Sequence, residues 1–144
     1  MQLAAFGATG RTGRPLCRQA LERGHTVIAH ARSPEKLPFA DDVTVVEGDV
    51  YAGTGVTEAI EGVDAVVSVL GQTAGSPDDL LTVAGDNVLG AMENAGVDRY
   101  VTLVGAGDLA LGFESIDRAD IARFVLDCLE GEEFVRKLPT VGPA

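Results

Sequence analysis

The sequence predicts an α/β protein in which a doubly wound parallel sheet carries helices on both faces. Strand-like and helix-like segments alternate along the chain, and a glycine-rich turn joins the first strand-like segment to the first helix-like one. The strand-like segments are short apolar runs with little polar alternation, which is typical of a parallel sheet covered on both sides. A chain of 144 residues suits one domain, residues 1–144, with its own hydrophobic core.

The order of the segments supports this fold class. Apolar runs predict strands, and amphipathic or capped stretches predict helices. The expected strands are residues 2–6, 26–30, 43–47, 65–70 and 100–104. The expected helices are residues 14–23, 56–61, a long helix that starts at 76–79 and runs to 95, and 117–129. Ser76 and Pro77 are start signals for the long helix, and Gly96 is its stop signal.

A glycine-rich turn follows the first expected strand directly. It reads Gly7-Ala-Thr-Gly10-Arg-Thr-Gly13, and a helix-like segment comes next. Glycines let a backbone approach a pyrophosphate group, and the helix behind them offers free N–H groups and the positive end of its dipole. A strand before the turn and a helix after it are the context that this motif requires. The sequence therefore predicts a Rossmann-like dinucleotide site. Its first contacts are expected at Gly7, Thr9, Gly10, Arg11, Thr12 and Gly13.

The end of the second expected strand predicts which nicotinamide cofactor binds. Sites that prefer NAD usually place an acid about twenty residues after the glycines, on the ribose 2′-hydroxyl. This chain has Arg32 and Ser33 there, and a guanidinium can accept a 2′-phosphate in bidentate fashion. We therefore expect NADP(H), with Arg32 as the main phosphate ligand, Ser33 as a hydroxyl donor and Lys36 as a second charge. The alternative is that Arg32 is an ordinary solvated arginine.

Two further strand ends contribute candidate cofactor contacts. Asp49 is expected to accept a hydrogen bond from the adenine amino group, with Val50 against the ring. Asp49 could equally cap a turn. After the fourth expected strand come Leu70 and Gly71, and the small Gly71 would let the ribose and the pyrophosphate pass. Ligands of such sheets bind at the carboxyl ends of the strands.

Composition excludes several classes of function. Twenty-two acidic residues against eleven basic ones give a net charge of −11, which argues against nucleic acid as a partner. An acidic chain that is poor in lysine suits a salt-rich, halophilic cytoplasm, although it could also be an ordinary acidic protein. There is no long apolar run or signal peptide, so we expect a cytoplasmic protein without membrane contact. Cys17 and Cys128 are expected to pack in the core, and no residue spacing suggests a metal site.

Together these motifs resemble the atypical short-chain dehydrogenase/reductase group. The resemblance is carried by the turn at 7–13, by Ala31-Arg-Ser-Pro-Glu-Lys-Leu37, by Gly48-Asp-Val50 and by the strand Asp64-Ala-Val-Val-Ser-Val-Leu-Gly71. Within that group the chain is most similar to NAD(P)H-binding proteins related to flavin reductase/biliverdin reductase B and to NmrA-like sensors. The resemblance implies NADP(H) as cofactor. It also implies that a polar residue at the position of Asn87 can face the pocket, although an exposed helix surface is an equal alternative.

The catalytic pair of the resembled superfamily is missing. Its usual members pass a proton through Tyr-x-x-x-Lys, whereas Tyr100 is followed four residues later by Val104, and Gly105 stands where related reductases carry serine or threonine. We therefore expect direct hydride transfer to a flavin or a quinone-like planar acceptor, with no catalytic residue assigned. The alternative is a non-catalytic redox sensor or scaffold of the NmrA-like type. An epimerase-like or dehydratase-like sugar-nucleotide enzyme is a third, disfavoured reading.

The chain is also shorter than the proteins it resembles. The difference falls between Gly107 and Gly112, within residues 105–113, where a helix, the sixth strand and much of the substrate pocket would stand. We expect a sheet shortened after its fifth strand, through a natural or engineered deletion or through a segment absent from this sequence. The fifth strand would then be an edge, covered by residues 139–142 or by a second copy of the chain in a homodimer.

Overall fold

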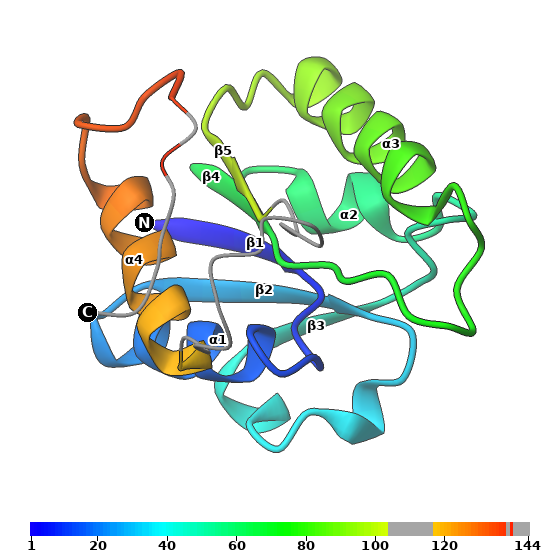
Figure 1. Ribbon diagram of the computed structural model, residues 1–144, viewed down its shortest axis with the longest axis horizontal. Coiled ribbons are helices and arrows are strands. Elements are labelled where there is room, and N and C mark those ends of the chain that lie inside the picture. Colours follow the sequence, from blue (N-terminus) through cyan, green and yellow to red (C-terminus); the bar gives the residue numbers. More distant parts are fainter. Residues whose placement is uncertain (104–116, 138, 140–144) are drawn as a thin grey trace, which may run out of the picture.

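Within the described residues, five parallel strands form one sheet in the order β3-β2-β1-β4-β5 (Figure 1). The strands are β1 (Gln2–Phe6), β2 (Thr26–Ala31), β3 (Thr44–Glu47), β4 (Ala65–Ser68) and β5 (Tyr100–Thr102). The structure is a computed structural model that describes residues 1–103, 117–137 and 139. The chain moves outward from β1 to β3 and then crosses to β4 on the other side of β1. This confirms the predicted parallel, doubly wound α/β class.

Helices cover both faces of the sheet. They are α1 (Gly13–Glu22), α2 (Val56–Ile60), α3 (Leu80–Ala95) and α4 (Arg118–Glu130), with two short 3₁₀ turns, η1 (Pro34–Lys36) and η2 (Ala40–Asp42). In Figure 1, α1 and α4 lie side by side on one face, and α2 and α3 lie on the other. Alternate residues of β1 serve the two faces: Leu3 and Ala5 join the core beneath α1 and α4, while Ala4 and Phe6 join the core beneath α2 and α3.

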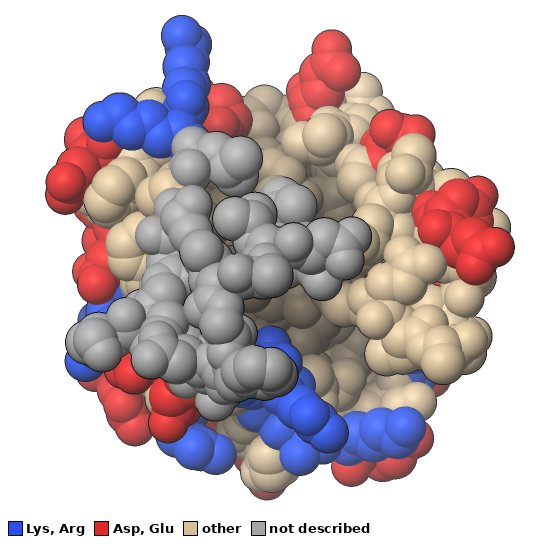
Figure 2. Space-filling model, viewed as in Figure 1, with Lys and Arg blue, Asp and Glu red and all other residues tan. Residues whose placement is uncertain are grey.

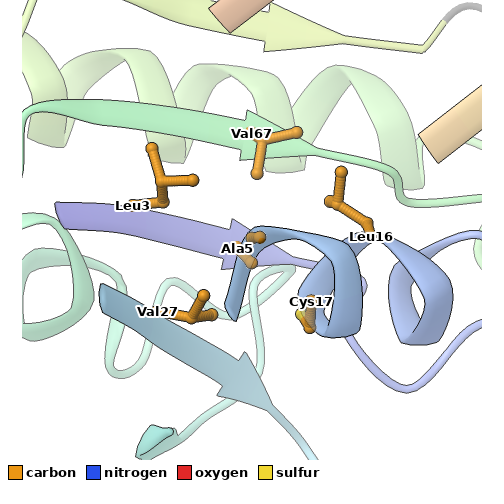
Figure 3. A pocket seen from close by; sticks show the side chains of 7 residues that line it. Leu3, Ala5, Leu16, Cys17, Val27 and Val67 are labelled. Carbon is orange, nitrogen blue, oxygen red and sulfur yellow. The ribbon is translucent and has the colours of Figure 1, made fainter. Parts of the chain in front are cut away.

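Cys17 lies in the core between α1 and the sheet, as predicted. It borders a small apolar void with residues of β1, β2 and β4 (Figure 3). Burial raises the pKa of the Cys17 thiol to about 12, because the thiolate would lose its hydration there. Cys128 is only half-buried. The void holds no polar side chain, and we regard it as a packing gap.

The strand register brings the carboxyl ends of all five strands to one edge. Phe6 lies beside His30 of β2 and Ser68 of β4, His30 lies beside Val46, and Ser68 lies beside Thr102. The segments that follow these residues therefore leave the sheet at the same edge, where all the predicted cofactor contacts belong.

The long helix begins later than the sequence predicts. It starts at Leu80, with Asp79 as N-cap residue, whereas we expected a start at 76–79. The Ser76 hydroxyl accepts a hydrogen bond from the Thr73 N–H at 3.1 Å, so it serves a turn that precedes the helix. Gln72 Nε2 donates to the carbonyl oxygens of Pro77 and Asp78, both at 3.1 Å, and keeps these residues outside the helix.

The end of β4 differs from the predicted one. Regular pairing of β4 ends at Ser68, two residues before the expected end at residue 70, although the Val69 N–H still donates to the Phe6 carbonyl at 3.0 Å. The expected shortening at 105–113, the end of the fifth strand at residue 104 and the tail at 140–142 lie outside the described residues.

Candidate functional site

Four segments with predicted cofactor contacts meet at the carboxyl edge of the sheet. The turn at 7–13 follows β1, the segment from Arg32 to Lys36 follows β2, Asp49 and Val50 follow β3, and Leu70 and Gly71 follow β4 (Figure 1). The structure thus places every predicted site residue in the segments that leave neighbouring strands at one edge. This edge includes the point between β1 and β4 where the strand order reverses, which is where ligands of such sheets bind.

The three glycines of the turn differ in what a side chain at their position would contact. Gly7 has φ +85°, and a Cβ on it would come within 2.9 Å of the Val69 carbonyl carbon. A Cβ on Gly13 would overlap the backbone of Gly7 and Ala8, so Gly13 lets α1 pack closely against the end of β1. Gly10 is exposed, and its nearest neighbour would be the Gly7 carbonyl oxygen at 3.3 Å. Packing therefore explains Gly7 and Gly13, while Gly10 leaves room for a group from outside the chain.

The start of α1 offers unused hydrogen-bond donors. Thr12 is the N-cap residue, yet its side chain makes no capping bond, and the first turn of the helix contains no acid. Among the described residues, the backbone N–H groups of Arg11 and Thr12 have no hydrogen-bond acceptor. Free N–H groups beside an exposed glycine at a helix start fit the pyrophosphate of a dinucleotide.

Cationic side chains surround this turn. Arg11, Arg14, Arg32 and Lys36 are all exposed, and Arg14 Nη2 donates to the Lys36 carbonyl oxygen at 3.4 Å, which links α1 to η1. Within the part of the chain that is described, none of these side chains forms an ion pair. Figure 2 shows Lys and Arg side chains gathered beside the hollow of this face. In a chain of net charge −11, such a cluster suits an anionic ligand.

The loop after β3 already uses the carboxylate of Asp49. Asp49 Oδ1 accepts a hydrogen bond from the Tyr51 N–H at 2.9 Å, and the Asp49 N–H donates to Thr54 Oγ1 at 2.8 Å. This is the turn-capping role that the sequence left open beside the adenine contact. The side chain of Val50 is buried in the core beneath α2 and α3. The expected contacts of both residues with adenine stay predictions.

Two side chains from other elements hold this loop, and sequence reasoning assigned neither of them to that role. His30 of β2 is buried, and its ring N–H donates from Nε2 to the Thr54 carbonyl oxygen at 2.8 Å. Asn87 of α3 donates from Nδ2 to the carbonyl oxygens of Val50 at 2.9 Å and Tyr51 at 3.3 Å. Gly48 is the residue in the sequence that could have indicated the close approach of His30 to this loop, because a Cβ on Gly48 would come within 2.8 Å of His30 Nε2.

The loop after β4 is open at the site. Leu70 is half-buried against the core beneath α2 and α3, whereas Gly71 is exposed and a Cβ on it would have no neighbour within 4 Å. Gly71 therefore leaves the space next to the glycine turn unobstructed.

A hydrogen bond joins the loop after β3 to the segment before α3. Tyr51 donates its hydroxyl to Asp79 Oδ1 at 2.9 Å, and this bond raises the pKa of Tyr51.

The described residues contain neither a metal-binding cluster nor a helix that could span a membrane. No group of three His, Cys, Asp or Glu side chains in residues 1–103, 117–137 and 139 is arranged to hold a metal ion. Among the described helices, none combines the length and the apolar composition needed to cross a bilayer.

The comparison with protein families shows the family of this chain. Residues 7–114 match the NAD(P)H-binding family, and this range includes the glycine turn and the ends of all five strands. The chain belongs to the NAD(P)H-binding family. The resemblance that the motifs indicated is thereby confirmed for the NAD(P)H-binding family and the Rossmann-like fold, and the preference for NADP(H) stays a prediction.

Relatives of this NAD(P)H-binding chain have varied names. It is 32% identical over 108 residues to the photosystem II assembly factor Ycf39 of Synechocystis, covering 70% of this chain and 32% of that protein. It is 33% identical over 109 residues to YwnB of Bacillus subtilis, covering 76% and 49%. The structure of the oxidoreductase ylbE from Lactococcus lactis superposes with a TM-score of 0.62 at 27% identity, covering 88% and 61%. The chain thus spans between about a third and a half of these two curated relatives.

Proposed function

We propose that this chain binds NADP(H) and reduces a flavin or a related quinone-like planar acceptor. The preference for NADP(H) over NAD(H) rests on the basic side chains that follow β2. Arg32 is exposed there, and Lys36 lies close to Arg14. Among the described residues, none of these cations forms an ion pair, so each is free to bind a phosphate group. The NAD(P)H-binding family and the fold support binding of a nicotinamide dinucleotide in general.

Each segment of the edge has its own part in holding the cofactor. The N–H groups of Arg11 and Thr12 would bind the pyrophosphate beside Gly10. Arg32, Ser33 and Lys36 would bind the 2′-phosphate. Asp49 Oδ1 is occupied by the Tyr51 N–H, which leaves Oδ2 for the adenine amino group. The rigid loop beneath it, held by His30 and Asn87, would keep this carboxylate in place.

Hydride transfer demands little of the protein in this proposal. When bound, the nicotinamide supplies the hydride, and the solvent supplies the proton that completes the reduction of the acceptor. The chain contributes orientation and a surface against which two planar rings can stack. The lack of a Tyr-x-x-x-Lys pair in the sequence at Tyr100 disfavours reduction of an isolated carbonyl, which needs a positioned proton donor.

The cofactor choice is tested by titrating NADPH and NADH separately, with nicotinamide fluorescence as the readout. We expect tighter binding of NADPH. Arg32→Asp should reverse the preference, because a carboxylate repels the 2′-phosphate and accepts the 2′-hydroxyl. Arg136→Asp is the matched control, since Arg136 is equally exposed but lies beyond α4. An unchanged ratio of the two affinities in Arg32→Asp would remove the assignment.

The acceptor is tested separately, by following NADPH oxidation with FMN or a quinone present. Oxidation that depends on the protein supports the reductase. Tight binding without oxidation supports the alternative, a non-catalytic NADP(H) sensor or scaffold of the NmrA-like type. The missing proton relay favours this alternative as the second candidate.

A further inference from the structure

An arginine far along the chain reaches the glycine turn. Arg118 is the first residue of α4, and its Nη1 donates a hydrogen bond to Thr12 Oγ1 at 3.3 Å. The two residues are 106 positions apart in the sequence, and they meet because α4 packs beside α1 on the same face of the sheet (Figure 1). Thr12 is buried, so this contact brings the guanidinium of Arg118 to the entrance of the turn.

The described acids that neighbour Arg118 in the sequence are engaged elsewhere. Asp117 Oδ1 accepts the Ala119 N–H at 2.8 Å as the cap of α4, and Asp120 Oδ1 pairs with Arg123 at 2.8 Å. Arg23 pairs with Asp127 and Glu130. Within the described ranges Arg118 takes part in no ion pair, and Thr12 Oγ1 is the acceptor it contacts. A guanidinium has five donors, so one bond to a neutral hydroxyl leaves most of its capacity unused.

We propose that Arg118 is a further phosphate-binding residue, which donates to the pyrophosphate group of the bound dinucleotide. This inference rests on the proposed function. The backbone N–H of Thr12, for which the described residues provide no acceptor, belongs to the same residue whose hydroxyl holds Arg118. An anion on that N–H would therefore lie next to the guanidinium, and a charge-assisted bond would form between them.

The position of Arg118 points to the pyrophosphate and not to the 2′-phosphate. Thr12 follows β1, whereas Arg32 and Ser33 follow β2, which is the neighbouring strand toward the outer edge of the sheet. Arg32 and Arg118 would thus bind two different phosphate groups of one ligand. A pyrophosphate is common to NADPH and NADH, so Arg118 should strengthen the binding of both cofactors without choosing between them.

The test compares Arg118→Gln with Arg123→Gln. Arg123 lies on the same helix and carries the same charge, but its guanidinium is paired with Asp120. We expect Arg118→Gln to weaken binding of NADPH and of NADH by about tenfold each, the effect typical of one hydrogen bond to a charged group. Arg123→Gln should leave both affinities unchanged. Arg118→Lys, which keeps the charge, should recover part of the loss.

Fragments of the cofactor provide a readout that does not depend on turnover. Binding of ADP, which contains the pyrophosphate, should weaken in Arg118→Gln by the same factor. Binding of adenosine 2′-monophosphate should not change. Circular dichroism and urea unfolding of each variant show whether α4 still packs on α1, and Arg118→Met, which keeps the apolar stem but removes the charge, replaces Arg118→Gln in the comparison if the latter does not fold.

The outcomes separate this inference from the proposed function. Equal losses for NADPH, NADH and ADP support it. A loss confined to NADPH would assign Arg118 to the 2′-phosphate and overturn the inference. Unchanged affinities would overturn it too, and would leave Arg118 as a structural tie between two helices. If the unmodified chain bound neither cofactor, the proposed function would fail first, and the inference with it.

Discussion

His30 and Thr54 join the middle of the sheet to the loop that follows β3. The ring N–H of His30 donates from Nε2 to the Thr54 carbonyl oxygen at 2.8 Å, and the ring lies 4.9 Å from that of Phe6. A second anchor, Asn87 Nδ2 on the Val50 carbonyl oxygen at 2.9 Å, holds the same loop from α3. The loop that carries Asp49 is therefore fixed from two sides before any ligand binds.

Replacing His30 by leucine should loosen this loop. His30→Leu keeps an apolar side chain beside Phe6 but removes the donor for the Thr54 carbonyl, at a cost of about 1–3 kcal/mol in the free energy of unfolding. Hydrogen exchange of the amides in residues 48–55 should become faster. His25→Leu is the control, because His25 pairs with Glu130 at the far side of α1. If both variants exchanged this loop equally fast, His30 would not be its anchor.

Replacing Gly13 and Gly10 by alanine should affect different properties: the first should lower stability, and the second should weaken cofactor binding. Gly13→Ala should lower the free energy of unfolding by about 1–3 kcal/mol, because the added Cβ meets backbone atoms of Gly7 and Ala8. Gly10→Ala should change it by less than about 0.5 kcal/mol, but should weaken NADPH binding, because the methyl occupies the approach to the N–H groups of Arg11 and Thr12. Urea unfolding and NADPH titration of both variants check this. NADPH binding by Gly10→Ala as tight as that of the unmodified chain would contradict the second expectation.

The sequence was sufficient for the fold class and for the edge of the sheet at which the candidate contacts lie. Apolar runs and the glycine turn predict β1 to β5 and the edge at which Arg32, Asp49 and Gly71 meet. Contacts between distant segments were not predictable. Arg118 meets Thr12 only because α4 packs on α1, and neither residue's neighbours in the sequence indicate this. The start of α3 was misplaced because Ser76, which was expected to mark the start of the helix, instead accepts the Thr73 N–H in a turn that precedes it.

Cys17 should be chemically inert in the folded chain. Burial raises the pKa of its thiol to about 12, so almost no thiolate is present near neutral pH. Burial first, and then Asp127 and Glu133, also raise the pKa of Cys128, but that residue is only half-buried. We expect iodoacetamide to label Cys128 slowly in the native state and Cys17 only after unfolding, as measured by intact mass and peptide mapping. Rapid labelling of Cys17 in the folded protein would contradict the core position.

Salt should stabilise this chain if its surface is adapted to a salt-rich cytoplasm. With a net charge of −11, the negative side chains of the folded chain repel one another at low ionic strength, and KCl screens this repulsion. We expect the free energy of unfolding, measured in urea, to rise steeply as KCl increases to molar concentrations. Potassium glutamate is a useful control for an effect of chloride. A stability that does not depend on salt would assign the acidity to an ordinary acidic protein.

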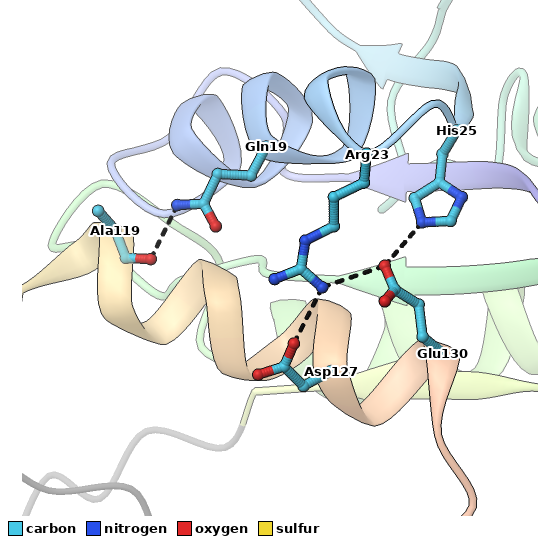
Figure 4. A network of polar contacts seen from close by, with 6 residues as sticks. All are labelled: Gln19, Arg23, His25, Ala119, Asp127 and Glu130. Atoms are coloured by element: carbon cyan, nitrogen blue, oxygen red, sulfur yellow. Dashed lines mark hydrogen bonds and ion pairs between the residues drawn. The ribbon is translucent and has the colours of Figure 1, made fainter.

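Acid should weaken the contact between α1 and α4 through Glu130. Its carboxylate accepts from His25 at 2.8 Å and from Arg23 at 3.1 Å, and Figure 4 shows both bonds joining α4 to the segment that directly follows α1. The hydrogen bond with His25, and then that with Arg23, lowers the pKa of Glu130 below 4.5 in the folded chain. The unfolded state therefore binds more protons near that pH. The contribution of Glu130 to stability is complete above about pH 4.5 and is lost as pH falls through the folded pKa.

Glu130→Gln should remove this part of the pH dependence. The carboxylate side chain is 36% exposed, so the expected change in the free energy of unfolding is only about 0.2–1 kcal/mol near neutral pH, and it should vanish in acid. Glu132→Gln is the matched control, because Glu132 pairs with Arg99 but is 85% exposed. Urea unfolding between neutral pH and pH 3 measures both variants. If Glu130→Gln and the unmodified chain lost stability in parallel as pH fell, other carboxylates would be responsible for the acid response, and the contact between α1 and α4 would depend on its apolar core and on the Gln19 bond to the Ala119 carbonyl.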